Sequence, residues 1–209
     1  MKNIWQIITL LLAVALVILS IKITMEKEPE KRVEIDTKQV GIDLIMTRSS
    51  VRSYTTEKPD ATTIETILKA GMAAPTAMNK QPWQFVVVND RATLDSIPTF
   101  VRGAHMARKA QVAIVVCGSV SEAASPTSWL LDCSAASENI LLAAHALGLG
   151  AVWCGAYPND AADRVGQMQK LLNLPEDVYA LNVIVMGYPD TEPTVKDKWN
   201  PAKVHYNKY

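Results

Sequence analysis

The chain has 209 residues, 49% of them hydrophobic and 20% charged, which suits one folded domain with a buried core. Its 21 basic residues balance its 21 acidic ones, so there is no basic field that would attract nucleic acid. The three cysteines are far apart and form no CxxC pair, which argues against a disulfide framework and a zinc site, and we expect no metal.

The first predicted element is a membrane segment at residues 4–21, an apolar run between Lys2 and Lys22. A helix of about 20 apolar residues spans the hydrocarbon layer of a bilayer. No small-x-small cleavage site follows the run, so we favour an uncleaved anchor, with a cleaved signal peptide as the alternative. We divide the chain into an anchor or signal segment (1–23), a charged linker (24–36) and a folded domain (37–209).

A basic segment follows a short helix that is predicted to start near Val40 and end at Thr47-Arg48. It reads Arg48-Ser49-Ser50-Val51-Arg52, with two arginines four residues apart and serines between them. Guanidinium groups and hydroxyls are natural donors to a phosphate. A basic surface turn is the alternative, and the segment taken alone favours that alternative.

A helix, a polar loop and a buried strand come next. Apolar residues at helical spacing predict a helix over Ile64–Ala74, capped by Asp60 or by Thr62 with Glu65 in a capping box. Pro75 ends the helix, and Trp83–Val88 is a strand rich in β-branched residues. The small and amide residues between them suit a stiff loop that positions a ligand, or an ordinary turn.

The rest of the chain alternates helices and strands and ends in a polar tail. Glu138 and Asn139 interrupt an apolar helix and are expected to cap it or to satisfy neighbouring backbone. Gly155 would let a ligand approach the backbone closely. The predicted elements are helices at Ala92–Ile97, Arg102–Ala110, Ser125–Leu147 and Ala161–Leu172, strands at Val112–Cys117, Ala151–Tyr157 and Tyr179–Met186, and the tail Asp190–Tyr209, which needs a partner subunit to lie against.

Four blocks in this order resemble the nitroreductase family of FMN-dependent oxidoreductases. They are the Arg48–Arg52 segment, Ala74–Trp83 (APTAMNKQPW), Glu138–Gly150 (ENILLAAHALGLG), and Gly187-Tyr188-Pro189 followed by Lys196 and Lys198. The resemblance covers Val40–Tyr209, which is the domain without the anchor. It implies an α+β fold with a central, mostly antiparallel sheet flanked by helices. It also implies an intertwined homodimer with two FMN molecules at the subunit interface.

The resemblance implies a role for each matching residue. Arg48, Ser49, Ser50 and Arg52 would hold the phosphate, ribityl chain and pyrimidine edge of FMN. A cation such as Arg52 near the pyrimidine would raise the electron affinity of the flavin.

The other implied contacts come from three further segments. Pro75, Thr76 and Ala77 would line the isoalloxazine ring from the other subunit, and Asn79 would bond the ring or its side chain. Lys196 and Lys198 would bind the phosphate, and the Gly155 N–H would approach flavin N5. Cys154 departs from the pattern, since some family members carry an acidic residue there.

The function implied is that of an NAD(P)H oxidoreductase, with no catalytic residue from the protein because the flavin carries the chemistry. Hydride would pass from nicotinamide C4 to flavin N5 and then to a nitroaromatic, a quinone or a similar electron-poor acceptor. Alternatives on the same fold are a flavin-dependent dehalogenase and a flavin-degrading enzyme. A membrane-tethered FMN-binding module without turnover and a purely structural domain are further alternatives. Because NAD(P)H is cytosolic, we expect the domain to face the cytoplasm, with an exported domain as the alternative.

Overall fold

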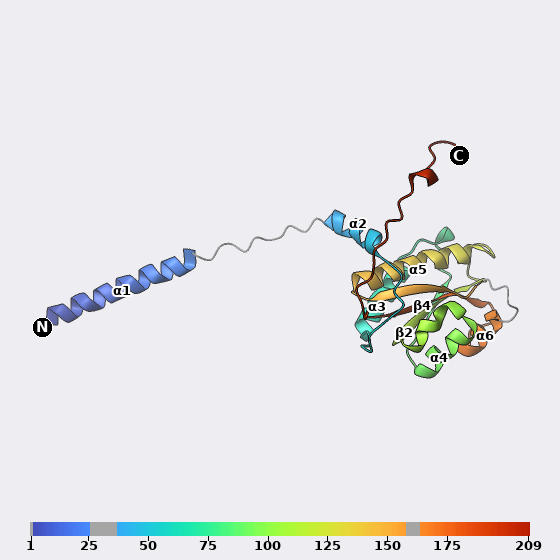
Figure 1. Cartoon of the computed structure of the whole chain (residues 1–209), viewed down its shortest axis with the longest axis horizontal. Helices are drawn as coiled ribbons and strands as arrows, with labels where there is room; N and C mark the ends of the chain where they lie inside the picture. Colours follow the sequence, from blue (N-terminus) through green and yellow to red (C-terminus); the bar gives the residue numbers. More distant parts are fainter. Residues whose placement is uncertain (1, 26–36, 158–163) are drawn as a thin grey trace. The chain divides into compact units, whose positions relative to one another are not determined.

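The computed structural model describes residues 2–25, 37–157 and 164–209 (Figure 1). The chain divides into two units, Met1–Thr37 and Lys38–Tyr209. Residues 24 and 25 of the predicted linker belong to α1, whereas its residues 26–36 and the first residues of the predicted helix at Ala161–Leu172 fall outside the described residues. The helices are α1 (Lys2–Met25), α2 (Thr37–Thr47), α3 (Ala61–Met72), α4 (Arg91–Phe100), α5 (Ser128–Ala146) and α6 (Arg164–Leu172), with short 3-10 helices η1 (Ala77–Asn79), η2 (Arg102–Arg108) and η3 (Pro201–Lys203).

The first unit contains the long apolar helix α1. Its window Asn3–Ser20 has a mean hydropathy of 2.2, and none of the window's residues whose burial is described is buried. Among the described residues this is the one helix that is long and apolar enough to cross a membrane. Whether it does so stays a prediction.

The second unit is built on a four-stranded sheet in the order β1-β2-β4-β3, with every neighbouring pair antiparallel. Every residue of the central strand β2 is buried, because β4 and β1 flank it and helices cover both faces. The strands are β1 (Trp83–Val88), β2 (Val112–Ser119), β3 (Gly150–Gly155) and β4 (Val178–Gly187). The predicted α+β class and antiparallel sheet are therefore confirmed.

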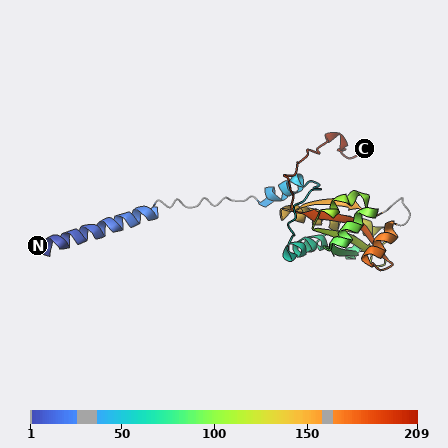
Figure 2. The same ribbon diagram turned by 60° about the horizontal axis from the view of Figure 1, so that its bottom comes forward.

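Two hydrophobic clusters cover the two faces of the sheet. One contains Ile67 of α3 and Ile140 of α5, and the other contains Leu94 of α4 and Met168 of α6. Alternate residues of one strand join different clusters: Ile114 faces the α3–α5 side, whereas its neighbours in β2 face the α4–α6 side. Figure 2 shows α4, in green, in front of the sheet.

The structure corrects several predicted boundaries. Asp60 caps α3 by accepting the Thr63 N–H at 2.7 Å, so the capping box at Thr62 was wrong. The predicted helix over Arg102–Ala110 is the 3-10 helix η2. Helix α5 begins at Ser128, after Pro126, because Ser125 forms a turn that accepts the Ser128 N–H at 3.2 Å.

Gly148 ends helix α5 in a left-handed conformation, as the sequence predicts. Gly148 has a φ of +78°, a left-handed conformation that glycine adopts without steric cost. The next N–H, that of Leu149, donates to the Ala144 carbonyl at 2.8 Å and closes the helix. The chain then turns directly into β3, so the C-terminal end of α5 lies next to the start of this edge strand.

Candidate functional site

The basic segment lies against the free edge of β3. Ser50 forms a parallel bridge with Ala151, and the Val51 N–H donates to the Ala151 carbonyl at 3.1 Å. The buried Tyr54 fixes the far end, since its hydroxyl contacts the carbonyl oxygens of Val51 at 2.6 Å and Val185 at 3.0 Å. The predicted phosphate-binding segment is thus an ordered strand-like extension of the sheet.

Gly150 makes this close approach possible. A Cβ atom at this position would lie 2.5 Å from the Val51 Cβ, a distance that real Cβ atoms do not adopt. The absence of a side chain at Gly150 therefore allows the basic segment to pack directly on the start of β3.

Helix α5 holds the start of the segment through two side chains. The Arg48 guanidinium lies 3.4 Å from the Glu138 carboxylate, and the Thr47 hydroxyl lies 2.9 Å from His145 Nε2. The Arg48 side chain is only 18% exposed, so its position is restricted. The expectation that Glu138 serves the backbone was wrong. For Asn139 it is confirmed, because its amide donates to the Ala70 carbonyl at 2.9 Å.

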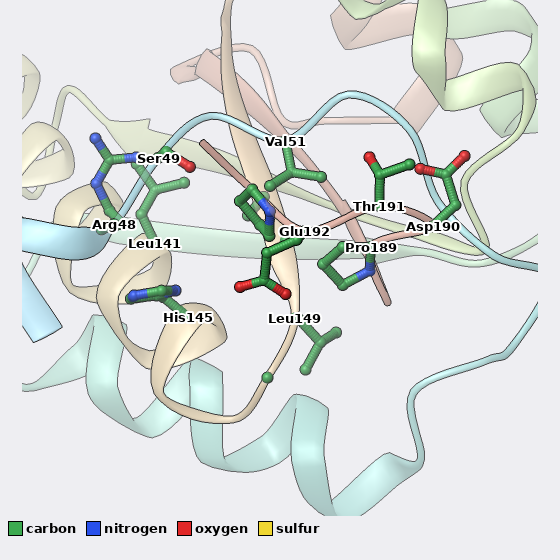
Figure 3. Close-up of a pocket in the computed structure, with 14 residues that line it drawn as sticks. Arg48, Ser49, Val51, Leu141, His145, Leu149, Pro189, Asp190, Thr191 and Glu192 are labelled. Atoms are coloured by element: carbon green, nitrogen blue, oxygen red, sulfur yellow. The ribbon is translucent and has the colours of Figure 1, made fainter. Parts of the chain in front are cut away.

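A pocket of about 410 Å³ opens beside this segment (Figure 3). Arg48 and His145 lie at one end of it, and Asp190 and Thr191 lie at the other. The Asp190 carboxylate accepts a hydrogen bond from Ser53, and Glu192 of the exposed tail adds a second carboxylate. The pocket is lined by Arg48, Ser49, Val51, Leu141, His145, Gly148, Leu149, Gly150, Ala151, Pro189, Asp190, Thr191, Glu192 and Pro193.

The opposite end of β3 presents open backbone. Gly155 is exposed, and among the residues that the structure describes no atom would lie within 4 Å of a Cβ added there. The strand ends in a fixed geometry because the N–H groups of Ala156 and Tyr157 both donate to the Leu181 carbonyl, at 2.9 and 3.0 Å. Leu181 is an extra residue in β4, opposite the step in register between Val116 and Cys117. A flat ligand can therefore approach the Gly155 backbone.

The Cys154 side chain points away from this open surface. It is 3% exposed, and its thiol donates to the Gly103 carbonyl at 3.1 Å. Burial raises the pKa of the Cys154 thiol to about 11, and the nearby Arg52 opposes this shift. The thiol is therefore neutral at physiological pH and packs as part of the core.

We expect Cys154 to make the protein less stable at alkaline pH. The thiol ionises from a pKa near 9.0 when unfolded but only near 11 when folded, so the folded state keeps its proton between these values. The free energy of unfolding should then fall by about 1.4 kcal/mol per pH unit for this group between pH 9 and 11. Urea unfolding of wild type and Cys154→Ala at each pH measures the difference, and equal slopes would contradict it.

The loop between α3 and β1 adopts an unusual backbone conformation. Met78, Asn79 and Gln81 have φ values of 54°, 55° and 53°, in the left-handed region, which costs roughly 1 kcal/mol or more per residue. The Thr76 hydroxyl accepts the Gln81 N–H at 3.1 Å, and Asn79 Oδ1 accepts from the Gln81 amide at 3.0 Å. Such a conformation persists only where surrounding contacts hold it.

One of these contacts comes from a residue that the sequence analysis did not select. Asp132 of α5 is buried, and its Oδ1 accepts the Ala77 N–H at 2.8 Å. The signal in the sequence was a carboxylate within an apolar helix, whose partner lies 55 residues away. Local patterns do not indicate such a partner.

Apart from those of the tail, the predicted site residues fall into three places within one chain. Arg48 and Ser49 line the pocket, and Ser50 and Arg52 are exposed along the edge of β3, towards Gly155. The loop Pro75–Asn79 lies further along α5. Asp132 contacts this loop and Glu138 contacts Arg48. The two helix residues are six positions apart, or about 9 Å along the helix axis.

The tail holds the remaining predicted residues. Lys196 and Lys198 are exposed and do not line the pocket. Their assignment to the phosphate stays a prediction, as do the assignments of the other site residues.

The sequence model of the nitroreductase family matches residues 45–104 and 101–188. A protein of Methanothermobacter thermautotrophicus, provisionally named as an NADH dehydrogenase/NAD(P)H nitroreductase, is 42% identical over 180 residues, covering 85% of this chain and 93% of the relative. A Bacteroides thetaiotaomicron structure with the same provisional name is 45% identical, with a TM-score of 0.77 and coverage of 81% and 98%. An FMN-dependent nitroreductase structure from Clostridium difficile R20291 is 27% identical, with a TM-score of 0.75 and coverage of 80% and 99%.

Proposed function

Because this chain belongs to the nitroreductase family, we propose that it is an enzyme that uses FMN to oxidise NAD(P)H and to reduce a small acceptor. The relatives provisionally named NAD(P)H nitroreductase and the FMN-dependent nitroreductase support the electron donor and the cofactor. When bound, FMN supplies the hydride chemistry, so the protein has to bind and orient it.

The observation that carries the proposal is the placement of Arg48 and Ser49. Both line the pocket, and the Arg48 guanidinium is held by Glu138 at 3.4 Å. A phosphate dianion favours such a fixed cation beside a hydroxyl. The residues present therefore fit the phosphate end of FMN, although the two carboxylates at the rim, Asp190 and Glu192, oppose an anion.

The edge of β3 fits the flat part of the cofactor. Arg52 is exposed on the segment beside β3, and its charge acts on Cys154, so it lies near the end of this strand. We propose that it faces the pyrimidine edge of FMN and stabilises negative charge there. The open backbone at Gly155 leaves room for the ring system.

We further propose that the working unit is a homodimer, in which Pro75–Asn79 contacts the FMN held by the partner. Within one chain this loop lies about 9 Å along α5 from the Arg48 contact. Exposed apolar surface is also available: Ile45 of α2 is 56% exposed and Trp199 of the tail 71%. Analytical ultracentrifugation tests this, and a monomer with full FMN affinity would refute it.

The proposed activity is tested on full-length protein purified in mild detergent. We expect FMN-type absorbance after reconstitution, and NAD(P)H oxidation that accelerates when menadione or a nitroaromatic is added. FMN binding without acceptor-dependent turnover would favour a binding module instead. Protein that remains colourless after reconstitution with FMN would refute the proposed function.

An iodinated tyrosine added as acceptor tests the dehalogenase alternative, and loss of flavin absorbance in the presence of oxygen tests the flavin-degrading alternative.

We propose that α1 anchors the domain to a membrane, facing the cytoplasm where NAD(P)H is available. Its support is the apolar window Asn3–Ser20 with a mean hydropathy of 2.2. Protease added to intact cells should leave the domain uncut, and digestion from outside would contradict the cytoplasmic orientation.

A further inference from the structure

Asp132 is a carboxylate buried within the apolar helix α5. Asp132 is 5% exposed, whereas the preceding residue, Leu131, is 75% exposed. One oxygen, Oδ1, accepts the Ala77 N–H at 2.8 Å. The other, Oδ2, is buried without a hydrogen-bond partner among the residues that the structure describes. Burying a carboxylate with one oxygen unsatisfied is unfavourable, so the contact to Ala77 needs an explanation.

Ala77 is the first residue of the 3-10 helix η1 within the strained loop. The left-handed residues Met78 and Asn79 follow it directly. The hydrogen bond from Asp132 therefore reaches the loop where the backbone leaves its ordinary conformation, and it joins this point to a rigid helix. Other bonds that shape the turn, such as that from the Gln81 N–H to Thr76, lie within the loop itself.

We infer that Asp132 is a positioning residue for the cofactor, because it holds the loop Pro75–Asn79 in the conformation that contacts FMN. This inference rests on the proposed function. Asp132 does not itself contact the cofactor in this arrangement; it acts through the Ala77 backbone. In the proposed dimer, α5 of one subunit thereby positions a wall of the flavin site that its partner completes.

The chemistry of the contact predicts which substitutions matter. Asp132→Ala removes the acceptor and leaves the Ala77 N–H unpaired, which frees the loop to leave its left-handed conformation. Asp132→Asn keeps an oxygen that can accept the same N–H. Ala77→Pro removes the donor instead, at the first position of a 3-10 helix, and the extended Thr76 before it (φ −134°, ψ 154°) tolerates a following proline.

The test is fluorescence titration of FMN into full-length apo-protein in detergent. We expect Asp132→Ala to raise the Kd for FMN about tenfold, and Asp132→Asn to stay within about threefold of wild type. Ala77→Pro should weaken FMN binding. The double variant Asp132→Ala/Ala77→Pro should bind FMN no more weakly than the weaker-binding of the two single variants, because both substitutions remove the same hydrogen bond.

Asp90→Ala is the matched control, because Asp90 Oδ1 accepts the Thr93 N–H at 2.9 Å at the start of α4, on the other side of the sheet. It should lower thermal stability and leave the Kd for FMN unchanged. If wild type binds no FMN, the proposed function fails. If wild type binds FMN and Asp132→Ala binds equally well, the positioning role alone fails. If Asp132→Ala does not fold, Ala77→Pro still tests the role, because it removes the donor of the same bond: an Ala77→Pro variant that binds FMN as tightly as wild type would also overturn it.

Discussion

Replacing Arg48 with alanine is expected to weaken FMN binding about a hundredfold, the upper range for losing charge-assisted hydrogen bonds. The substitution also leaves the Glu138 carboxylate, now 3.4 Å from the guanidinium, without its partner at the pocket. That free negative charge repels the phosphate. Flavin fluorescence titration measures the Kd, and Arg102→Ala, at an exposed position outside the pocket, is the control.

A second substitution separates the two effects. If the repulsion from Glu138 contributes, Arg48→Ala/Glu138→Gln should bind FMN several-fold more tightly than Arg48→Ala alone. The affinity of wild type should also fall with added salt more steeply than that of Arg48→Ala, because a phosphate contact is screened. An Arg48→Ala variant with wild-type affinity would remove Arg48 from the site.

Replacing Gly150 with alanine is expected to reduce both stability and FMN binding. The new Cβ would lie 2.5 Å from the Val51 Cβ, so either β3 or the basic segment has to move. Overpacking of this kind costs about 1–3 kcal/mol of the free energy of unfolding. Because the displaced segment carries Arg48 and Arg52, FMN affinity should fall as well.

Gly103→Ala provides the matched comparison. A Cβ at Gly103 meets no atom of the described part of the chain within 4 Å, and the residue has no left-handed φ. Its free energy of unfolding should change by no more than about 0.5 kcal/mol. Urea unfolding of both variants measures the contrast. Equal stability of the two would mean that the basic segment is not packed on β3 as the structure has it.

The parts of the fold that local physics determines were predictable from the sequence. The β-branched run at Trp83–Val88 is a strand with those bounds, and Gly148 ends α5 as predicted. The start of α5 was not predictable. Pro126 suits the first turn of a helix, but Ser125 forms a separate turn by accepting the Ser128 N–H, and the helix begins only at Ser128. The 3-10 helix η2 was also missed, since Ala104, Met106 and Ala107 pack into the core with a spacing that suits either kind of helix.

The site was predictable in its residue types but not in its connections. The resemblance selected Arg48 and Ala77, which lie on two separate segments. Their partners on α5, Glu138 and Asp132, are 90 and 55 residues away in the chain. No periodicity or capping rule connects residues at such separations, so these contacts depend on how the helix packs on the sheet.

Helix α5 therefore fixes the directions in which Asp132 and Glu138 point, as well as the distance between them. A residue of an α-helix advances by about 100°, so Asp132 and Glu138 point about 120° apart. The buried side of the helix holds the loop, while its more open side holds Arg48. One residue inserted between them would turn Glu138 by about another 100° and move it away from Arg48. A change in length is thus not compatible with the site within the six residues that separate its two contacts.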